Sequence, residues 1–397
     1  MNYDFDSIVE RRGTSCVKWD AGNGVGVPPG EVIPMWVADM DFKTAPCVIE
    51  ALRDRVEHGV FGYTLPSDSY YEAVISWFKR RRGWTIEKDW IQYITAVVPA
   101  LAVCVKAFTE QGDKVVFLTP AYNCFFSCVR DAGCICSGSP VVYSSEDGVL
   151  KVSVDWEDLE RRCAEPGAKV LLLCNPQNPV GRIWTPEELA RFGEIARRNG
   201  LVVLSDEIHC DLEMPGRRFT PFAAVSVENQ SCCVTMNSPS KSFNTASLQI
   251  ANIICSIPEW RVRIDRVMSV MEANNVGPFG VAGLQAAYNG GEEWLRELNE
   301  YLLGNFCLLR DMFARELPQC SVTELQATYL AWVDVSWVGR GSQEIVDSLI
   351  AVEHVRPGPG IIYGDDRFLR INLACPRSLC EEGLRRIIRG LKRLNEH

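Results

Sequence analysis

The chain has 397 residues, of which 47% are hydrophobic and 23% charged, a composition typical of a globular protein with one large and one smaller domain. Its 41 basic and 51 acidic residues give a formal net charge of −10, and the densest basic cluster, residues 79–82, is best explained as the solvated end of a helix, which argues against a nucleic-acid-binding surface. The longest apolar run, residues 97–105, contains Pro99 and is too short to span a bilayer.

Three features of the sequence bear on the cellular compartment of the protein and on whether it binds a metal. The N-terminus is acidic where a secretory signal would be basic, so we expect a cytoplasmic protein. The 17 cysteines are scattered through apolar runs, which favours buried reduced thiols over disulfides. The sequence has no C-x-x-C pair and its four histidines lie far apart, so we expect no metal site.

The first 45 residues are rich in glycine and proline and predict an extended arm with little helix. The arm ends in residues 32–42 (VIPMWVADMDF), where an apolar run meets two carboxylates. Asp39 therefore belongs either to a strand end with a helix N-cap or to the wall of a substrate pocket. A helix is expected over residues 46–57. The two glycines of residues 59–63 (GVFGY) permit a tight bend that presents Tyr63, for which core packing is the alternative.

From residue 91 onward, apolar stretches of strand length alternate with amphipathic helices. This pattern predicts a mostly parallel sheet covered on both faces, with ligands at the carboxyl ends of its strands. Helices are expected at residues 99–108, 122–131 and 186–198, and strands at residues 114–118, 168–174 and 201–204. Two long helices (258–273 and 291–315), strands at 329–334 and 368–373, and a final helix at 379–394 predict a small α+β domain.

Four residues with chemical potential follow apolar strand-like runs at residues 115–118, 170–173, 201–204 and 234–236: Tyr122, Asn178, Asp206 and Lys241, in that order. Lys241 lies in residues 238–244 (SPSKSFN) and is either a solvated loop lysine or an amine that forms a Schiff base with a carbonyl cofactor. Asp206 comes just after the apolar residues 201–204 and Ser205, so it is either a helix N-cap or a buried carboxylate that needs a partner such as a pyridinium nitrogen. Asn178 lies in a loop fixed by two prolines, which suits recognition of a phenolic oxygen.

A phosphate-binding position is predicted where a helix begins after a short strand, at Val97 and Val98. Free backbone N–H groups and the helix dipole bind anions at such a point. Ser238 and Ser240 can add hydroxyl donors to the same group.

Taken together, these motifs resemble the fold-type I pyridoxal 5'-phosphate (PLP) enzymes, the aspartate aminotransferase superfamily, and more closely its MalY/PatB-type cystathionine β-lyase (C–S lyase) branch. The motifs that carry the resemblance span essentially the whole chain: residues 32–42 (VIPMWVADMDF), 59–63 (GVFGY), 119–122 (TPAY), 175–179 (NPQNP), 205–209 (SDEIH), 240–244 (SKSFN) and 370–372 (RIN).

The resemblance implies an α/β fold of the PLP-dependent transferase type I. A large domain with a mostly parallel seven-stranded sheet between helices would be followed by a small α+β domain at the C-terminus. We expect an arm over residues 1–45 that packs with the small domain, a PLP-binding domain over residues 46–285 and the small domain over residues 286–397.

The resemblance also implies roles for the residues around the cofactor. Lys241 would bind PLP and then remove the substrate Cα proton, Asp206 would pair with the pyridine nitrogen, and Tyr122 would stack on the ring. Asn178 would bond the 3-oxygen of the ring. His209 stands three residues after Asp206, where many aminotransferases have a tyrosine, and would lie near the same oxygen.

Further implied roles concern the substrate and a second subunit. Arg370 would clamp the α-carboxylate bidentately, with Asn178 and Asp39 also on the substrate side. Tyr63 would reach the phosphate of the neighbouring subunit's cofactor, which implies a homodimer with shared active sites. The chain departs from the branch before the phosphate helix: residues 94–96 are ITA instead of a glycine-containing turn such as SPG, and Ala96 fits only if its φ stays negative.

The implied activity is a PLP-dependent β-lyase that acts on small cysteine S-conjugates, with L-cystathionine as the leading substrate. Two alternatives stay open. One is an aminotransferase for a hydrophobic or aromatic amino acid, since the same residues support both reactions. The other is a regulatory protein that binds a transcription factor, although the sequence shows no appended DNA-binding domain.

Overall fold

The structure is a computed structural model that describes residues 2–22, 24–28, 30–146 and 149–396. Within these ranges, seven strands form the sheet of the larger part of the molecule. Their order across the sheet is β4 (Ile135–Glu146), β3 (Lys114–Thr119), β6 (Ala168–Cys174), β7 (Val202–Asp206), β8 (Cys233–Asn237), β9 (Ala251–Ile254) and β2 (Ile91–Ile94). The pairings from β4 to β8 are parallel, and those of β8 with β9 and β9 with β2 are antiparallel. The predicted mostly parallel, seven-stranded sheet is confirmed.

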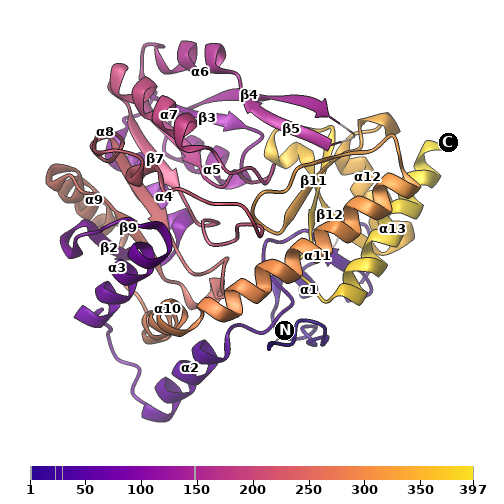
Figure 1. The fold of residues 1–397 in the computed structure, drawn as a ribbon, viewed down its shortest axis with the longest axis horizontal. Coiled ribbons are helices and arrows are strands. Elements are labelled where there is room, and N and C mark those ends of the chain that lie inside the picture. Colours follow the sequence, from indigo (N-terminus) through magenta and orange to yellow (C-terminus); the bar gives the residue numbers. More distant parts are fainter. Residues whose placement is uncertain (1, 23, 29, 147–148, 397) are drawn as a thin grey trace.

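Helices cover both faces of this sheet (Figure 1), which explains why its central strands are nearly continuous apolar runs. In β3, Val115 and Phe117 pack into one core cluster, and Val116 and Leu118 pack into the other. The first cluster includes residues of α4 (Val97–Phe108), α5 (Asn123–Asp131) and α9 (Pro258–Met271), and the second includes residues of α6 (Trp156–Cys163) and α7 (Pro186–Arg198). The alternation of side chains along each strand thus fixes which helix covers which face.

A second group of strands continues the same sheet order beyond β4. This group runs β1 (Ile33–Met35), β12 (Val355–Pro359), β13 (Phe368–Asn372), β11 (Leu330–Asp334), β10 (Ser321–Thr323) and β5 (Val149–Val154), and β5 joins β4 antiparallel. The long helices α11 (Glu292–Glu316) and α13 (Arg377–Asn395) lie side by side against it (Figure 1). The N-terminal arm contributes β1, which pairs in parallel with β12. The predicted domain limits after residues 45 and 285 stay predictions.

The remaining helices are α1 (Val17–Asp20), α2 (Pro46–His58), α3 (Asp68–Arg82), α8 (Val227–Gln230), α10 (Pro278–Gly290) and α12 (Ser342–Ser348). The helices predicted to begin at residues 46, 186 and 258 begin there, each with a proline in its first turn, where the missing N–H costs no hydrogen bond. Helix α10 was not predicted, because Gly280 and Gly283 obscure its helical pattern in the sequence.

The interpretation of residues 79–82 as a solvated helix end is wrong for its last member. Arg82 is the final residue of α3, but its side chain is only 3% exposed. It forms ion pairs with Asp211 at 3.2 Å and with Glu213 at 2.8 Å. Carboxylates from a segment far along the chain therefore bury this guanidinium, and no local pattern reveals that.

All seventeen cysteines are free thiols, and eleven of them are buried. Among the residues that the structure describes, no helix has both the length and the apolar character needed to cross a membrane.

Candidate active site

A cavity of about 130 Å³ lies where β6, β7 and β8 end and α4 begins. It collects nine of the residues that the sequence analysis singled out: Val97, Val98, Tyr122, Asn178, Asp206, His209, Ser238, Ser240 and Lys241. The carboxyl ends of adjacent parallel strands share one edge of a sheet, so residues that follow different strands meet there.

Lys241 lies in a tight turn just after β8. The backbone N–H of Ser240 donates to Oγ of Ser238 at 3.0 Å, and Phe243 N donates to the carbonyl of Pro239 at 2.8 Å. The turn directs the lysine into the cavity, where Nζ donates to the carbonyl of Ala38 at 2.7 Å. Burial lowers the pKa of Lys241, partly opposed by the charge of Asp39. A lowered pKa increases the fraction of neutral amine, which is the form that acts as nucleophile or base.

Asp206 is the last residue of β7 and is buried. Oδ1 accepts a hydrogen bond from the backbone N–H of Ile208 at 3.1 Å. Burial raises the pKa of this carboxyl to about 6, although the Ile208 bond and the nearby Lys241 lower it. No described residue forms an ion pair with Asp206, so a bound group with an N–H donor would supply the partner that a buried carboxylate needs.

His209 is buried beside the same cavity, with its ring edge-on to Tyr329 at 6.3 Å between centroids. Burial and, to a smaller extent, the cations Lys241 and Arg370 lower the pKa of His209 to about 3, so the imidazole is neutral at pH 7. Its Nδ1 is buried and has no hydrogen-bond partner among the described residues. A buried ring nitrogen without a partner is the kind of group that a ligand satisfies.

The start of α4 provides an anion-binding position. Ala96 is the N-cap, no side chain caps the helix, and Val97 and Val98 line the cavity. The N–H groups of the first turn are thus left for a ligand, with the positive end of the helix dipole behind them. Ala96 has a φ of −164°, an extended conformation open to any residue, so the missing glycine in residues 94–96 brings no backbone strain.

The two serines predicted to bind the same anion are differently placed. Oγ of Ser238 donates to the carbonyl of Ile250 at 2.7 Å while accepting from Ser240 N. Ser238 would have to exchange that bond to donate to a phosphate, so its predicted role stays a prediction. Ser240 lines the cavity and is partly exposed.

Tyr122 follows β3 and is the N-cap residue of α5. Burial and the neighbouring Cys124 thiol raise the pKa of its hydroxyl, so it stays protonated. Its ring packs edge-on against Phe125 at 6.3 Å between centroids, which holds it at the cavity wall. A fixed aromatic wall suits stacking against a flat ring.

Arg370 reaches the site from β13. Nη1 donates to Oδ1 of Asn178 at 3.2 Å, Nη2 donates to the carbonyl of Trp36 at 2.8 Å, and the guanidinium lies 4.4 Å from the ring centroid of Tyr363. Its Nε is buried without a partner among the described residues. An oriented, buried fork with a free donor fits a carboxylate ligand.

Besides Arg370, which meets the cavity through Asn178, two predicted residues do not line it. Tyr63 is fully exposed on the connection between α2 and α3. Asp39 does not line the cavity; its Oδ2 accepts from Nη2 of Arg11 at 2.8 Å. The roles of both residues stay predictions.

The partners of Lys241 and Tyr122 were not predicted from the sequence. The carbonyl of Ala38 accepts from Lys241, and Ala38 lies in the motif of residues 32–42. Every residue has a backbone carbonyl, so the sequence does not indicate which one binds a side chain. Tyr329, whose hydroxyl donates to the same carbonyl at 3.0 Å, was assigned only to a strand. Cys124 follows Tyr122 by two residues, and its sequence position alone did not distinguish it from the other sixteen cysteines.

A larger hollow of about 720 Å³ lies between α11 and α13, away from these residues. Most of its lining residues are charged, and cations such as Arg385 and Lys392 are paired with Glu381 and Glu316. The catalytic potential of the chain therefore lies in the smaller cavity.

Comparison with known proteins gives consistent matches over nearly the whole chain. Residues 31–387 match the family described as aminotransferase class I and II. The chain is 38% identical over 390 residues to the cystathionine beta-lyase PatB of Bacillus subtilis, covering 97% of this chain and 98% of PatB.

Solved structures agree. A PLP-bound putative aminotransferase from Clostridium difficile superposes with a TM-score of 0.94 at 34% identity, covering 98% of this chain and 100% of that one. A PLP-bound C-S lyase from Staphylococcus hominis superposes with a TM-score of 0.90 at 33% identity, covering 98% of both chains.

Proposed function

The chain belongs to the class I and II aminotransferase family, and we propose that it is a PLP-dependent carbon–sulfur lyase that releases a thiol, pyruvate and ammonia from cysteine S-conjugates. L-cystathionine is the leading substrate, as the name of the Bacillus subtilis relative suggests. The observation that carries the proposal is the single cavity lined by Lys241, with its lowered pKa, and by the buried Asp206.

The residues around this cavity fit PLP. Asp206 offers an acceptor to a pyridinium N–H, and the uncapped start of α4 offers donors to a phosphate. Tyr122 offers a ring face, and Asn178 and the unpartnered Nδ1 of His209 offer polar groups for the ring oxygen. When bound, PLP supplies an electron sink for the bond that breaks at the substrate Cα.

Lys241 is assigned two tasks in this mechanism: it holds the cofactor, and its Nζ then takes the proton from the substrate Cα. Loss of that proton allows the Cβ–S bond to break, and the sulfur leaves as a thiol. Addition of water to the remaining three-carbon fragment gives pyruvate and ammonia. Arg370 binds the α-carboxylate through its fork, oriented by Asn178 and Trp36.

Transamination is the competing reaction, and the Clostridium difficile neighbour, a putative aminotransferase by name, favours keeping it in view. The pure enzyme should be incubated with PLP and L-cystathionine but no keto acid. Catalytic release of pyruvate and thiol supports the lyase. Turnover only after addition of 2-oxoglutarate would overturn the lyase in favour of the aminotransferase.

We also propose a homodimer in which Tyr63 serves the partner's active site. Tyr63 is fully exposed, and its neighbours Val60, Phe61 and Leu65 are 62%, 56% and 78% exposed. A cluster of exposed apolar side chains on one connection is typical of a subunit interface. A cytoplasmic location is proposed as well, because seventeen free thiols suit a reducing compartment.

A further inference from the structure

The segment that forms one wall of the active site, residues 36–42, is here called the wall segment. The two side chains with the most important predicted roles both bind its backbone. Nη2 of Arg370 donates to the carbonyl of Trp36 at 2.8 Å, and Nζ of Lys241 donates to the carbonyl of Ala38 at 2.7 Å. The position of this backbone therefore helps to orient both the guanidinium and the amine.

Two asparagines bind the same backbone. Nδ2 of Asn372, two residues after Arg370 in β13, donates to the carbonyls of Val37 and of Asp39, the latter at 2.7 Å. Asn244, three residues after Lys241, accepts from the backbone N–H of Met40 at 2.9 Å and donates to the carbonyl of the same residue at 3.0 Å. The wall segment thus bridges the strand that carries Arg370 and the turn that carries Lys241.

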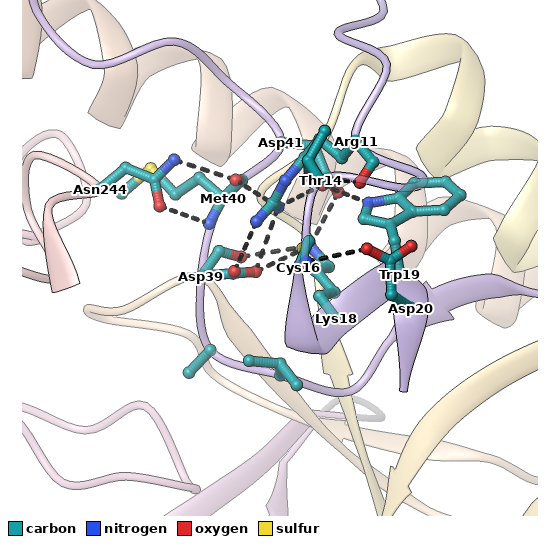
Figure 2. Close-up of polar contacts among 12 residues, drawn as sticks. Arg11, Thr14, Cys16, Lys18, Trp19, Asp20, Asp39, Met40, Asp41 and Asn244 are labelled. Atoms are coloured by element: carbon teal, nitrogen blue, oxygen red, sulfur yellow. Dashed lines mark hydrogen bonds and ion pairs between the residues drawn. The ribbon is translucent and has the colours of Figure 1, made fainter. Parts of the chain in front are cut away.

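On its other side the wall segment is held by charges from the N-terminal arm (Figure 2). Arg11 donates from Nη2 to Oδ2 of Asp39 at 2.8 Å and from Nη1 to Oδ1 of Asp41 at 2.7 Å. Lys18 donates from Nζ to Oδ2 of Asp41 at 2.7 Å and to the carbonyl of Asp39 at 3.2 Å. Nε1 of Trp19 also donates a hydrogen bond to Oδ1 of Asp41, at 2.8 Å.

The pair of Lys18 and Asp41 is buried, with side chains 1% and 4% exposed. Burial alone would raise the pKa of Asp41, but Lys18 and the other donors hold it below its usual range. Removing one partner of such a pair leaves an uncompensated buried charge, so the arrangement resists displacement. The backbone N–H of Asp41 also donates to the carbonyl of Ala374 at 2.8 Å, four residues beyond Arg370.

We propose that Arg11 and Lys18 are positioning residues for the substrate's α-carboxylate. They fix the wall segment through Asp39 and Asp41, and the wall segment in turn sets the rotation of the Arg370 fork. The inference rests on the proposed function only in that the ligand is an α-amino acid. It explains why Arg11 and Lys18, which do not line the cavity themselves, are tied to the wall segment by three ion pairs of 2.8 Å or less.

The test uses the holoenzyme and L-alanine, which has the α-amino and α-carboxylate groups but no leaving group on Cβ. Its dissociation constant is measured from the change in cofactor absorbance and, separately, from the shift in thermal unfolding temperature. Lys18→Met and Arg11→Met should each raise this constant by about five- to tenfold, a size typical of coupling between residues in one network. The kcat of the eliminating reaction should change less than the KM.

A matched control is Arg162→Met on α6. Arg162 is paired with Asp158, and the two side chains are 24% and 19% exposed, close to the 20% and 22% of Arg11 and Asp39. Arg162 does not line the cavity, so this variant should keep the wild-type dissociation constant. Lys18→Arg should restore part of the lost affinity because it returns a cation to Asp41.

A double-mutant cycle separates positioning from general loss of stability. In an Arg370→Ala background, Lys18→Met should weaken L-alanine binding no further, because its effect passes through the missing guanidinium. An unchanged constant in the single variants, or an equal further loss in the Arg370→Ala background, would overturn the proposal. If Lys18→Met does not fold, Arg11→Met and Asp39→Asn carry the same cycle at partly exposed positions. A wild type that binds L-alanine but yields no pyruvate from cystathionine overturns the lyase assignment alone.

Discussion

Nη1 of Arg370 donates a hydrogen bond to Oδ1 of Asn178 at 3.2 Å, which joins residues 192 positions apart in the chain. Arg370 comes from β13 in the second group of strands, and Asn178 comes from the loop after β6 in the larger sheet. The bond therefore connects the predicted clamp for the substrate carboxylate with the predicted partner of the cofactor's ring oxygen. Changes to either residue should alter how the substrate is held relative to the ring.

Replacing Arg370 with alanine should raise the KM for L-cystathionine about 10- to 100-fold, because a hydrogen bond to a charged group contributes about 1.5–3 kcal/mol. The KM of Arg370→Lys should lie between those of the wild type and Arg370→Ala, since lysine keeps the charge but not the paired N–H donors of the guanidinium. Steady-state kinetics of pyruvate release measure both. A KM within twofold of the wild type in Arg370→Ala would mean that another group binds the carboxylate.

Replacing Lys241 with alanine should abolish both the visible absorbance that the wild type shows with PLP and the release of pyruvate. The lysine is the group assigned to hold the cofactor and to move the Cα proton, so both signals depend on it. Lys114→Ala, which breaks only a peripheral ion pair with Glu165, is the control and should keep both. A colourless wild type after addition of PLP would contradict the cofactor assignment.

Much of the site was predictable because it follows strand ends. Tyr122, Asn178, Asp206 and Lys241 each come after an apolar run, and parallel strands bring such positions to one edge. Pattern alone therefore indicated that these four residues meet. Their chemical roles came from the resemblance to a family and not from the pattern.

The positions of several charged residues could not be predicted, because they depend on contacts between distant parts of the chain. The bond between Arg11 and Asp39 joins residues 28 positions apart, through an arm that the sequence describes only as irregular. Likewise, Arg82 was assigned to solvent because it ends a basic run, yet Asp211, 129 positions away, helps to bury it. Charged residues are placed by their partners, and the partners are fixed only by the tertiary fold.

Tyr63 offers a test of the dimer by complementation. Tyr63→Phe lacks the hydroxyl assigned to the partner's phosphate, and Lys241→Ala lacks the amine. If the two proteins are refolded together in equal amounts, half of the dimers are mixed and one of their two sites is intact, so about a quarter of wild-type activity should return.

The control for this experiment mixes Lys241→Ala with Arg370→Ala, measured at a substrate concentration below KM. Lys241 and Arg370 are assigned to the same site and come from one chain, so no mixed dimer should have an intact site and activity should not recover. Recovery equal to that of the Tyr63 mixture, or no recovery in the Tyr63 mixture, would contradict a shared site.

Glu207, next to Asp206, should make the stability of the protein depend on pH. It is buried, and Oε1 accepts from Oγ of Ser205 at 2.8 Å and from the backbone N–H of Phe222 at 2.9 Å. Its Oε2 has no partner among the described residues. Burial raises the pKa of Glu207 from an ordinary value of 4.5 to about 8, although the two hydrogen bonds and Arg82 oppose the shift.

The folded protein therefore keeps a proton on Glu207 over a range in which the unfolded chain has lost it. Stability falls with pH wherever the folded state binds more protons, so this group destabilises the fold progressively from pH 4.5 to about 8. Glu207→Gln, which cannot ionise, removes that dependence. Between pH 4.5 and 7, the free energy of unfolding of Glu207→Gln minus that of the wild type should therefore increase by about 3 kcal/mol.

Urea unfolding of both proteins at pH 5 and pH 8 checks this result. Burial also raises the pKa of Asp206, to about 6. Asp206 therefore causes a smaller loss of stability with rising pH, but this loss is the same in both proteins and cancels in their difference. Glu50→Gln on the exposed surface of α2 should keep the pH dependence of the wild type. Parallel curves for the wild type and Glu207→Gln would mean that Glu207 is ionised in the folded protein, and that Arg82 or solvent supplies the charge compensation for its carboxylate.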